Sequence, residues 1–379
     1  MSGVDQESSS VRAPRSDESR ISDPESRPVL IMAGGTGGHI FPGLAVAEAL
    51  RAQGVPVTWL GAVGGMETRV VPAHGINLHA IAVGGLRGKG WKTRLAAPWM
   101  LARALLSALV VLRQCKPRAV LSMGGYVAGP GGVAARFLHC PLVVHEQNRV
   151  AGFTNRKLAG YAQRVLAGFA DTLPGATWVG NPVRSAIAAL TPPAERFAQH
   201  AGRARLLVLG GSLGARALNA ALPRALARLP HDRRPEVLHQ SGQRGEAEAR
   251  AAYAQAGVEA RIVPFIDDMA GTYAWADLAV CRAGALTLAE LTAAGLGAVL
   301  VPFPHAVDDH QTRNAEALVA AGAAQLIQER DLNVDELAQR LGALLDDRAH
   351  LVAMAAAART LAKPDAAEAI ARACMEVAA

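Results

Sequence analysis

The amino-acid sequence predicts an α/β protein with two Rossmann-like domains that face each other across a cleft. Two stretches, one near Val29 and one starting at Arg205, both read as a buried strand, a glycine loop and a helix. Their loops open with the pairs Gly34-Gly35 and Gly210-Gly211. Glycine turns at strand ends are typical of open α/β sheets that bind ligands there. The length of 379 residues is enough for two such domains.

The composition favours a soluble globular protein with acidic partners. Hydrophobic residues make up 51% and charged residues 19%, and the net charge is +7 with a pI near 9.6. Such a balance suits phosphates, nucleic acid or an anionic membrane surface. The aromatic content of 4% and the lack of a nucleic-acid motif count against nucleic acid. The four cysteines have no paired or metal-ligand spacing, which predicts reduced thiols.

Two segments are excluded as membrane-targeting elements. The polar stretch from Met1 to Arg27 has no apolar core, so we expect a disordered tail and not a signal peptide. The longest apolar run, Leu95 to Leu112, is interrupted by Pro98 and Arg103 and is too short to span a bilayer.

The first glycine loop precedes a candidate catalytic histidine. We expect a strand at Val29 to Ala33, a loop to Gly38 and a helix from about Pro42, since proline suits a first helical turn. The spacing is not G-x-G-x-x-G, and the next strand lacks the acidic end of a dinucleotide site, so an NAD enzyme is disfavoured. His39 lies at the loop-helix junction, where it could accept a proton or merely cap the turn.

A basic and aromatic region follows. Gly84 to Gly90 is a glycine-rich loop that carries Arg87 and Lys89. The helix after it, from Trp91 to Arg113, combines tryptophans with basic residues, which suits a membrane interface; the alternative is that these aromatics belong to the core.

The rest of the first half predicts ligand-facing turns. A third strand leads into the glycine-rich turn Ser122 to Gly132, and Pro141 to Asn148 reads as a buried strand that ends in four polar residues. Polar residues at the carboxyl end of a parallel strand lie where these sheets bind ligands. Thr191 to Pro193 read as the hinge between the halves.

The second half contains a βαβ unit suited to a nucleotide diphosphate. Its strand at Leu278 to Cys281 leads through a turn to a helix whose first N–H groups could hold phosphates at Ala285 to Thr287. Glu290 further along could accept both ribose hydroxyls. The alternative is an ordinary turn with a solvated carboxylate. Ser212 in the second glycine loop offers another phosphate cradle.

Polar side chains after Pro304 predict a turn that binds sugar hydroxyls. Asp309, His310, Gln311 and Asn314 fall at the next strand-to-helix connection, where acid and amide groups could bind hydroxyls. The chain has no Asp-x-Asp triplet and no metal-ligand spacing, so we expect no metal ion and no other cofactor.

Eight motifs occur in order along the chain. They are G-G-T-G-G-H-I-F-P-G-L-A, G-L-R-G-K-G, G-G-Y-V-A-G-P-G-G, H-E-Q-N, G-N-P-V-R, G-G-S-L-G-A-R, R-A-G-A-L-T-L-A-E and D-D-H-Q-T-R-N. Together they resemble the MurG glycosyltransferases, over Arg27 to about Leu326. The resemblance implies a GT-B fold and a hexosyltransferase that moves GlcNAc from UDP-GlcNAc to undecaprenyl-pyrophosphoryl-MurNAc-pentapeptide, turning lipid I into lipid II for peptidoglycan. It also implies a peripheral enzyme on the cytoplasmic face of the bacterial inner membrane.

The resemblance also implies site residues. His39 and Glu146 are its candidates for the general base. Its substrate-binding positions match Thr36, Gly37 and Gly38 for the acceptor side; Asn148 and Gln311 for the donor sugar; Arg184 and Ser212 for the UDP phosphates; Ile266 for uracil; and Ala285, Leu286, Thr287, Leu288, Ala289 and Glu290 for phosphates and ribose. Two positions depart from the family pattern: Leu213 replaces glutamine, and Gly297 replaces a proline, which we expect only to loosen a turn.

These patterns lead to one mechanism and two rivals. We expect an acceptor domain at 28–187, a UDP-GlcNAc domain at 188–360 and a helix at 361–379 that returns to the first domain. The transfer would be a single displacement with inversion, His39 being the first choice as base and Glu146 the second. The rivals are a UDP-GlcNAc 2-epimerase, which needs no lipid acceptor, and a membrane scaffold that only binds UDP-sugar.

Overall fold

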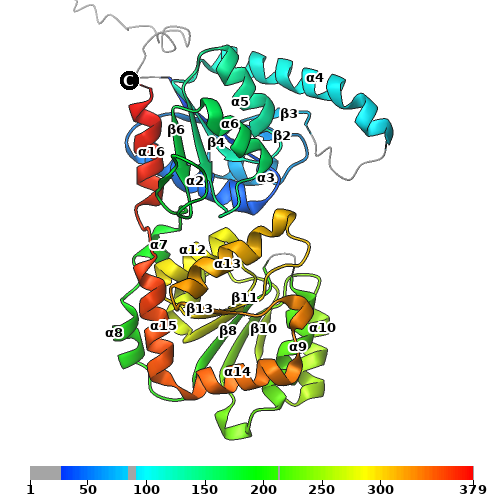
Figure 1. The fold of residues 1–379 in the computed structure, drawn as a ribbon, viewed down its shortest axis with the longest axis vertical. Helices are drawn as coiled ribbons and strands as arrows, with labels where there is room; N and C mark the ends of the chain where they lie inside the picture. Colours follow the sequence, from blue (N-terminus) through cyan, green and yellow to red (C-terminus); the bar gives the residue numbers. More distant parts are fainter. Residues whose placement is uncertain (1–26, 84–90, 212–213, 379) are drawn as a thin grey trace, which may run out of the picture.

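The computed structural model describes residues 27–83, 91–211 and 214–378, with the side chains of 91–96 and of residue 307 left out. The chain forms two parallel sheets, one in each half (Figure 1). The first has the strand order β3-β2-β1-β4-β5-β6-β7 and the second the order β10-β9-β8-β11-β12-β13. Both are parallel sheets of the predicted α/β class, one in each half of the chain as the predicted GT-B fold requires.

The strand bounds follow the buried apolar runs of the sequence. The first sheet is built from β1 (Val29–Ala33), β2 (Val57–Ala62), β3 (Asn77–Ile81), β4 (Ala119–Gly124), β5 (Leu142–Glu146), β6 (Arg164–Ala167) and β7 (Thr177–Trp178). The second is built from β8 (Arg205–Leu209), β9 (Glu236–Gln240), β10 (Arg261–Val263), β11 (Leu278–Cys281), β12 (Ala298–Leu300) and β13 (Ala324–Leu326).

Helices cover both faces of each sheet. They are α2 (Gly37–Ala52), α3 (Glu67–Ala73), α4 (Trp91–Cys115), α5 (Ala128–Phe137), α6 (Phe153–Leu158), α7 (Ser185–Ala188), α8 (Pro193–Ala198), α9 (Arg216–Ala227), α10 (Glu246–Ala256), α11 (Met269–Trp275), α12 (Ala285–Ala294), α13 (His310–Ala320), α14 (Val334–Asp346), α15 (Arg348–Thr360) and α16 (Ala366–Glu376).

Burial on both faces explains the continuous apolar strands. In β1, Val29 and Ile31 join a core cluster with residues of α2 and α16, whereas Leu30 and Met32 join a second cluster with residues of α4 and α5. A parallel sheet covered on both sides needs apolar residues at every position of its central strands. Because β1 and β8 are central in their sheets, the glycine loops that follow them are held by buried strands.

The last helix joins the first domain, although it follows the second in sequence. In Figure 1, α16 runs along the upper domain, while α15 lies beside the lower one. Ile370 and Cys374 of α16 are fully buried in the core that contains Ile40 and Leu44 of α2. The domain boundaries given above stay a prediction.

Three expectations for local structure were wrong. The helix after the first glycine loop begins at Gly37, and Pro42 lies inside it, so Gly38 loses the intrahelical partner of its carbonyl group. A strand at Asn77–Ile81 was not expected; as the edge strand β3 it is only partly buried and therefore lacks an apolar run. Gly297 does more than loosen a turn, because a Cβ there would lie 2.8 Å from the Cβ of Met354 in α15.

Candidate active site

Helices α2 and α12 lie on the facing sides of the two domains (Figure 1). Each follows a central strand, β1 or β11, and the two helices contact each other. This contact places the helix after the first glycine loop and the helix after the predicted phosphate turn at the junction of the two domains, where the sequence predicts a cleft. It is the arrangement that doubly wound sheets use for ligands, because the carboxyl ends of central parallel strands open there.

The start of α12 has the geometry of an anion site. Its N-cap Gly284 has an extended backbone, and no side chain caps the helix. The first internal helical hydrogen bond runs from Leu288 N to Gly284 O, so the N–H groups of Ala285, Leu286 and Thr287 point outward. Together with the helix dipole, these groups suit a phosphate.

Glu290 is mostly shielded from solvent and paired, so the alternative of a solvated carboxylate was wrong. Its side chain is 16% exposed and lies 3.7 Å from Nε of Arg184. The Tyr273 hydroxyl donates a hydrogen bond to Oε2 at 3.0 Å. Burial raises the pKa of Glu290, while Arg184 and the Tyr273 hydrogen bond act in the opposite direction. The residues predicted for ribose and phosphate are therefore neighbours, with Arg184 contributed by the segment that links the domains.

His39 does not cap its helix. It lies in the first turn of α2, where no side-chain cap is formed. Its Nδ1 instead lies 2.9 Å from Oε1 of Gln147, the residue after Glu146 at the end of β5. The imidazole is partly exposed, so it can reach both the buried polar end of β5 and the cleft.

Glu146 holds the loop that follows β5. It is 2% exposed. Its Oε1 accepts hydrogen bonds from the backbone N and the Nδ2 of Asn148, and its Oε2 accepts from Gly152 N and from Asn155 Nδ2, at 3.0 to 3.3 Å. A carboxylate with both oxygens occupied by donors is poorly placed to take a proton from a substrate.

The same loop connects the two domains. Asn314 of α13 is fully buried, accepts from Arg149 N at 2.8 Å and donates to Asn148 Oδ1 at 3.2 Å and to Ala283 O at 3.3 Å. Asn314 was expected to read sugar hydroxyls; here its amide fixes the domain contact. The Asn148 amide is shared between Glu146 and Asn314, so its contact with a donor sugar stays a prediction.

The other predicted residues fall into three groups. Thr36, Gly37 and Gly38 form the N-cap and first turn of α2, with Thr36 and Gly38 exposed. Ile266 is buried just after β10, and Gln311 begins α13, where its Oε1 accepts from Phe303 N at 2.9 Å. Leu288 is buried on α12, and Ala289 is partly buried beside it. Ser212 and Leu213 lie outside the described residues, as do Arg87 and Lys89.

Several polar residues around the site were missed. Glu67 is fully buried and accepts hydrogen bonds from Gly35 N and Ala62 N at 3.3 and 2.8 Å. Asn155 connects Ser122, His145 and Glu146, and Tyr273 positions Glu290. The sequence signal for Glu67 and Asn155 is weak, because each is a single polar residue in a segment without a motif.

An apolar surface covers the end of the first domain that is farthest from the second. On α4, Trp99 is 76% and Leu106 64% exposed, so this face is not core. A groove of about 470 Å³ lies beside it, lined by Leu101, Tyr126 and Phe153 together with Lys157. No helix within the described residues is long and apolar enough to cross a membrane.

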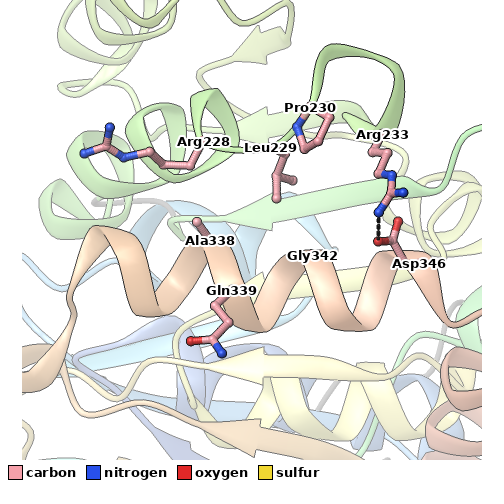
Figure 2. Close-up of a pocket in the computed structure, with 8 residues that line it drawn as sticks. All are labelled: Arg228, Leu229, Pro230, Arg233, Ala338, Gln339, Gly342 and Asp346. Carbon is pink, nitrogen blue, oxygen red and sulfur yellow. Dashed lines mark hydrogen bonds and ion pairs between the residues drawn. The ribbon is translucent and has the colours of Figure 1, made fainter.

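A second pocket lies away from the cleft. It is formed between α14 and the segment after α9. At one end of it Arg233 Nη1 lies 3.1 Å from Asp346 Oδ2, the ion pair drawn in Figure 2. None of the residues that line this pocket belongs to either glycine turn. Among the residues that the structure describes, no cluster of three or more His, Cys, Asp or Glu side chains could hold a metal ion.

The fold and cleft define a glycosyltransferase of the two-domain GT-B class. Residues 29–167 match the glycosyltransferase family 28 N-terminal domain, and residues 205–370 match the family 28 C-terminal domain. The chain therefore belongs to glycosyltransferase family 28, and within it to the MurG family.

Named relatives support this assignment. The chain is 61% identical over 345 residues to the UDP-N-acetylglucosamine--N-acetylmuramyl-(pentapeptide) pyrophosphoryl-undecaprenol N-acetylglucosamine transferase of Xanthomonas axonopodis pv. citri, covering 91% of this chain and 81% of that protein. It is 60% identical to the protein of the same name from Xylella fastidiosa, covering 92% and 96%. The crystal structure of Acinetobacter baumannii MurG is similar with a TM-score of 0.82 and 41% identity, covering 92% of this chain and 99% of that one.

Proposed function

We propose that this protein transfers GlcNAc from UDP-GlcNAc to undecaprenyl-pyrophosphoryl-MurNAc-pentapeptide, with inversion at the anomeric carbon. The observation that carries the proposal is the contact between α2, which carries His39 in its first turn, and α12 of the other domain, whose start has no side-chain cap. Relatives with about 60% identity carry the name of this activity. The product would be lipid II, an intermediate of peptidoglycan synthesis.

The second domain would bind the donor and stabilise the leaving group. The N–H groups at Ala285 to Thr287 would hold the diphosphate, and Arg184 would add a positive charge beside it. Glu290 would accept a ribose hydroxyl on the oxygen that faces Arg184, because Tyr273 already occupies the other. Backbone groups at Ile266 would contact uracil. The resemblance adds Ser212, Gln311 and Asn148 as further donor contacts.

The first domain would bind and activate the acceptor. The exposed turn at Thr36, Gly37 and Gly38 lets backbone groups approach the acceptor diphosphate. His39 would take the proton from the attacking sugar hydroxyl as that oxygen bonds to the anomeric carbon and UDP departs. We propose Glu146 as a positioning residue, since its hydrogen bonds hold the loop that carries Asn148.

A lipid-linked acceptor requires contact with a membrane surface. We propose that the exposed face of α4 and the groove beside it rest on the anionic cytoplasmic leaflet, which makes the enzyme peripheral. Apolar side chains such as Trp99 and Leu106 would enter the interface, while Lys157 at the groove and the overall charge of +7 would favour anionic headgroups.

The experiment is transfer of labelled GlcNAc from UDP-GlcNAc to a short-chain analogue of the lipid-linked muramoyl-pentapeptide, in the presence of EDTA. We expect wild-type turnover to persist in EDTA and to fall about 10²- to 10⁴-fold in His39→Ala, the usual contribution of a general base. His74→Ala is the matched control, because His74 is an exposed histidine whose ring contacts the carbonyl oxygen of Val70 in its own helix. Wild-type protein that binds UDP-GlcNAc but transfers nothing would refute the proposal.

An epimerase remains the rival enzyme. It would convert UDP-GlcNAc alone and would gain nothing from vesicles or from the lipid acceptor. Release of an isomerised UDP-sugar without acceptor would therefore favour the epimerase and contradict transfer.

A further inference from the structure

A chain of hydrogen bonds runs from the backbone near the domain junction to His39. Nε2 of His145 lies 2.9 Å from the carbonyl oxygen of Gly180. Nδ1 of His145 lies 3.1 Å from Nε2 of Gln147, and Oε1 of Gln147 lies 2.9 Å from Nδ1 of His39. His145 and Gln147 are both almost completely buried.

The carbonyl of Gly180 fixes the direction of this chain. A carbonyl oxygen only accepts, so Nε2 of His145 must carry the proton. Burial lowers the pKa of His145 to about 4, which keeps the ring neutral near pH 7 and leaves Nδ1 as an acceptor. The amide nitrogen of Gln147 therefore donates to it.

Gln147 cannot turn its amide around. Its Nε2 lies 3.2 Å from the backbone oxygen of His145 as well as 3.1 Å from the ring nitrogen. A reversed amide would place an oxygen against two acceptors and would lose both hydrogen bonds. The oxygen Oε1 must therefore face His39, and Nδ1 of His39 must be the donor.

The backbone under the imidazole keeps the ring in this position. Gly124, at the end of β4, has φ of +105°, and a Cβ at that position would lie 3.1 Å from both Cε1 and Nδ1 of His39. The ring thus packs directly on a glycine that has no side chain to displace it.

We propose that Gln147, oriented by His145, is a positioning residue that holds His39 as the Nδ1–H tautomer and keeps Nε2 unprotonated as the proton acceptor. This inference rests on the proposed function only for its catalytic meaning. In the step, the acceptor O–H bond breaks and its proton goes to Nε2. The oxygen bonds to the anomeric carbon, and the carbon–oxygen bond to UDP breaks. The resulting imidazolium still donates from Nδ1 to Gln147.

The test reads the tautomer directly by NMR. Long-range proton–nitrogen spectra of full-length protein labelled with ¹⁵N-histidine distinguish Nδ1–H from Nε2–H rings, and His39→Ala assigns the signal. We expect Nδ1–H in the wild type. In Gln147→Leu we expect a shift to Nε2–H, the tautomer that an unconstrained histidine side chain favours. The value of kcat should fall about 10- to 100-fold, with the KM for UDP-GlcNAc little changed. This fall is smaller than the roughly 10²- to 10⁴-fold contribution of a general base, because His39 itself is still present.

Gln163→Leu is the matched control. Gln163 accepts a hydrogen bond from Leu142 N at the opposite end of β5, so this replacement also removes a glutamine contact to the same strand. It should leave the His39 tautomer and kcat as in the wild type. If Gln147→Leu does not fold, Gln147→Met offers an unbranched side chain of similar length.

Two results would overturn the inference: an Nε2–H ring in the folded wild type, or an Nδ1–H ring that persists after Gln147 is replaced. Both are read without substrate. A wild type that shows the Nδ1–H ring but transfers no GlcNAc would refute the proposed function and leave the positioning of His39 standing.

Discussion

Replacement of Glu146 by glutamine separates a structural carboxylate from a catalytic one. Glu146 accepts hydrogen bonds from Asn148 on one oxygen and from Gly152 and Asn155 on the other. In Glu146→Gln, one oxygen becomes an NH₂ group that faces two donors, whichever way the amide is turned. The variant therefore loses two hydrogen bonds and gains a buried group without an acceptor.

The expected loss of stability is large. A hydrogen bond to a charged group contributes about 1.5 to 3 kcal/mol, so two of them amount to about 3 to 6 kcal/mol. This is a substantial part of the roughly 5 to 15 kcal/mol that stabilises a typical domain. The loss should be concentrated in the first domain, where Glu146 ends β5.

Two measurements follow the change. Urea unfolding at pH 7.5 should show a lower midpoint for Glu146→Gln, and hydrogen exchange followed by mass spectrometry should be faster in peptides that cover residues 147–155. Glu236→Gln is the control, because Glu236 is exposed and its ion pair, from Oε2 to Arg205 Nε, is long at 3.9 Å. This replacement should change the free energy of unfolding by less than about 0.5 kcal/mol. A Glu146→Gln protein with wild-type stability and exchange but no turnover would refute the structural role and make Glu146 the base.

Three further predictions use other parts of the structure. Glu290→Ala should raise the KM for UDP-GlcNAc about 10- to 100-fold, because a charged acceptor for the ribose is lost; an unchanged KM in steady-state kinetics would contradict this. Leu106→Glu should weaken sedimentation with phosphatidylglycerol vesicles about tenfold, since an exposed α4 leucine would no longer enter the interface, whereas Val319→Glu on the second domain should bind as the wild type does. Burial lowers the pKa values of His145 and His239 to about 4, so the stability that their neutral rings contribute is present above pH 6.5 and is lost as the pH falls toward 4. At pH 5 each histidine should lower the free energy of unfolding in urea by about 2 kcal/mol. Equal stability at pH 7 and pH 5 would contradict this.

The central part of the fold could be predicted because its signals are local. Buried strands such as Val29–Ala33 and Leu278–Cys281 are continuous apolar runs, and glycine loops follow them. The edge strand Asn77–Ile81 could not be found in this way, because one side of it lacks a neighbouring strand and its residues are partly polar. Pro42 was misleading, since the helix already starts after the N-cap residue Thr36 and proline is accommodated six residues later.

In the candidate site, too, residues with a local sequence signal were predicted and residues that depend on the folded structure were not. His39 and Glu290 were predicted as site residues from their place after a glycine turn or on a nucleotide-type helix. Their partners were not, because Gln147 and Tyr273 reach them from other elements of the fold. The sequence predicts Glu146 as a second candidate base, but it could not predict the four hydrogen-bond donors that the folded loop brings to its oxygens.

The stereochemistry of the product tests the central claim most directly. Wild-type protein would be given UDP-GlcNAc, whose sugar is α-linked, and the short-chain lipid-linked muramoyl-pentapeptide, and the anomeric proton of the transferred GlcNAc would be observed by NMR. A single displacement, with His39 as base and the start of α12 holding UDP, predicts a β-linked product. An α-linked product would contradict the single displacement and the roles assigned to both sides of the cleft.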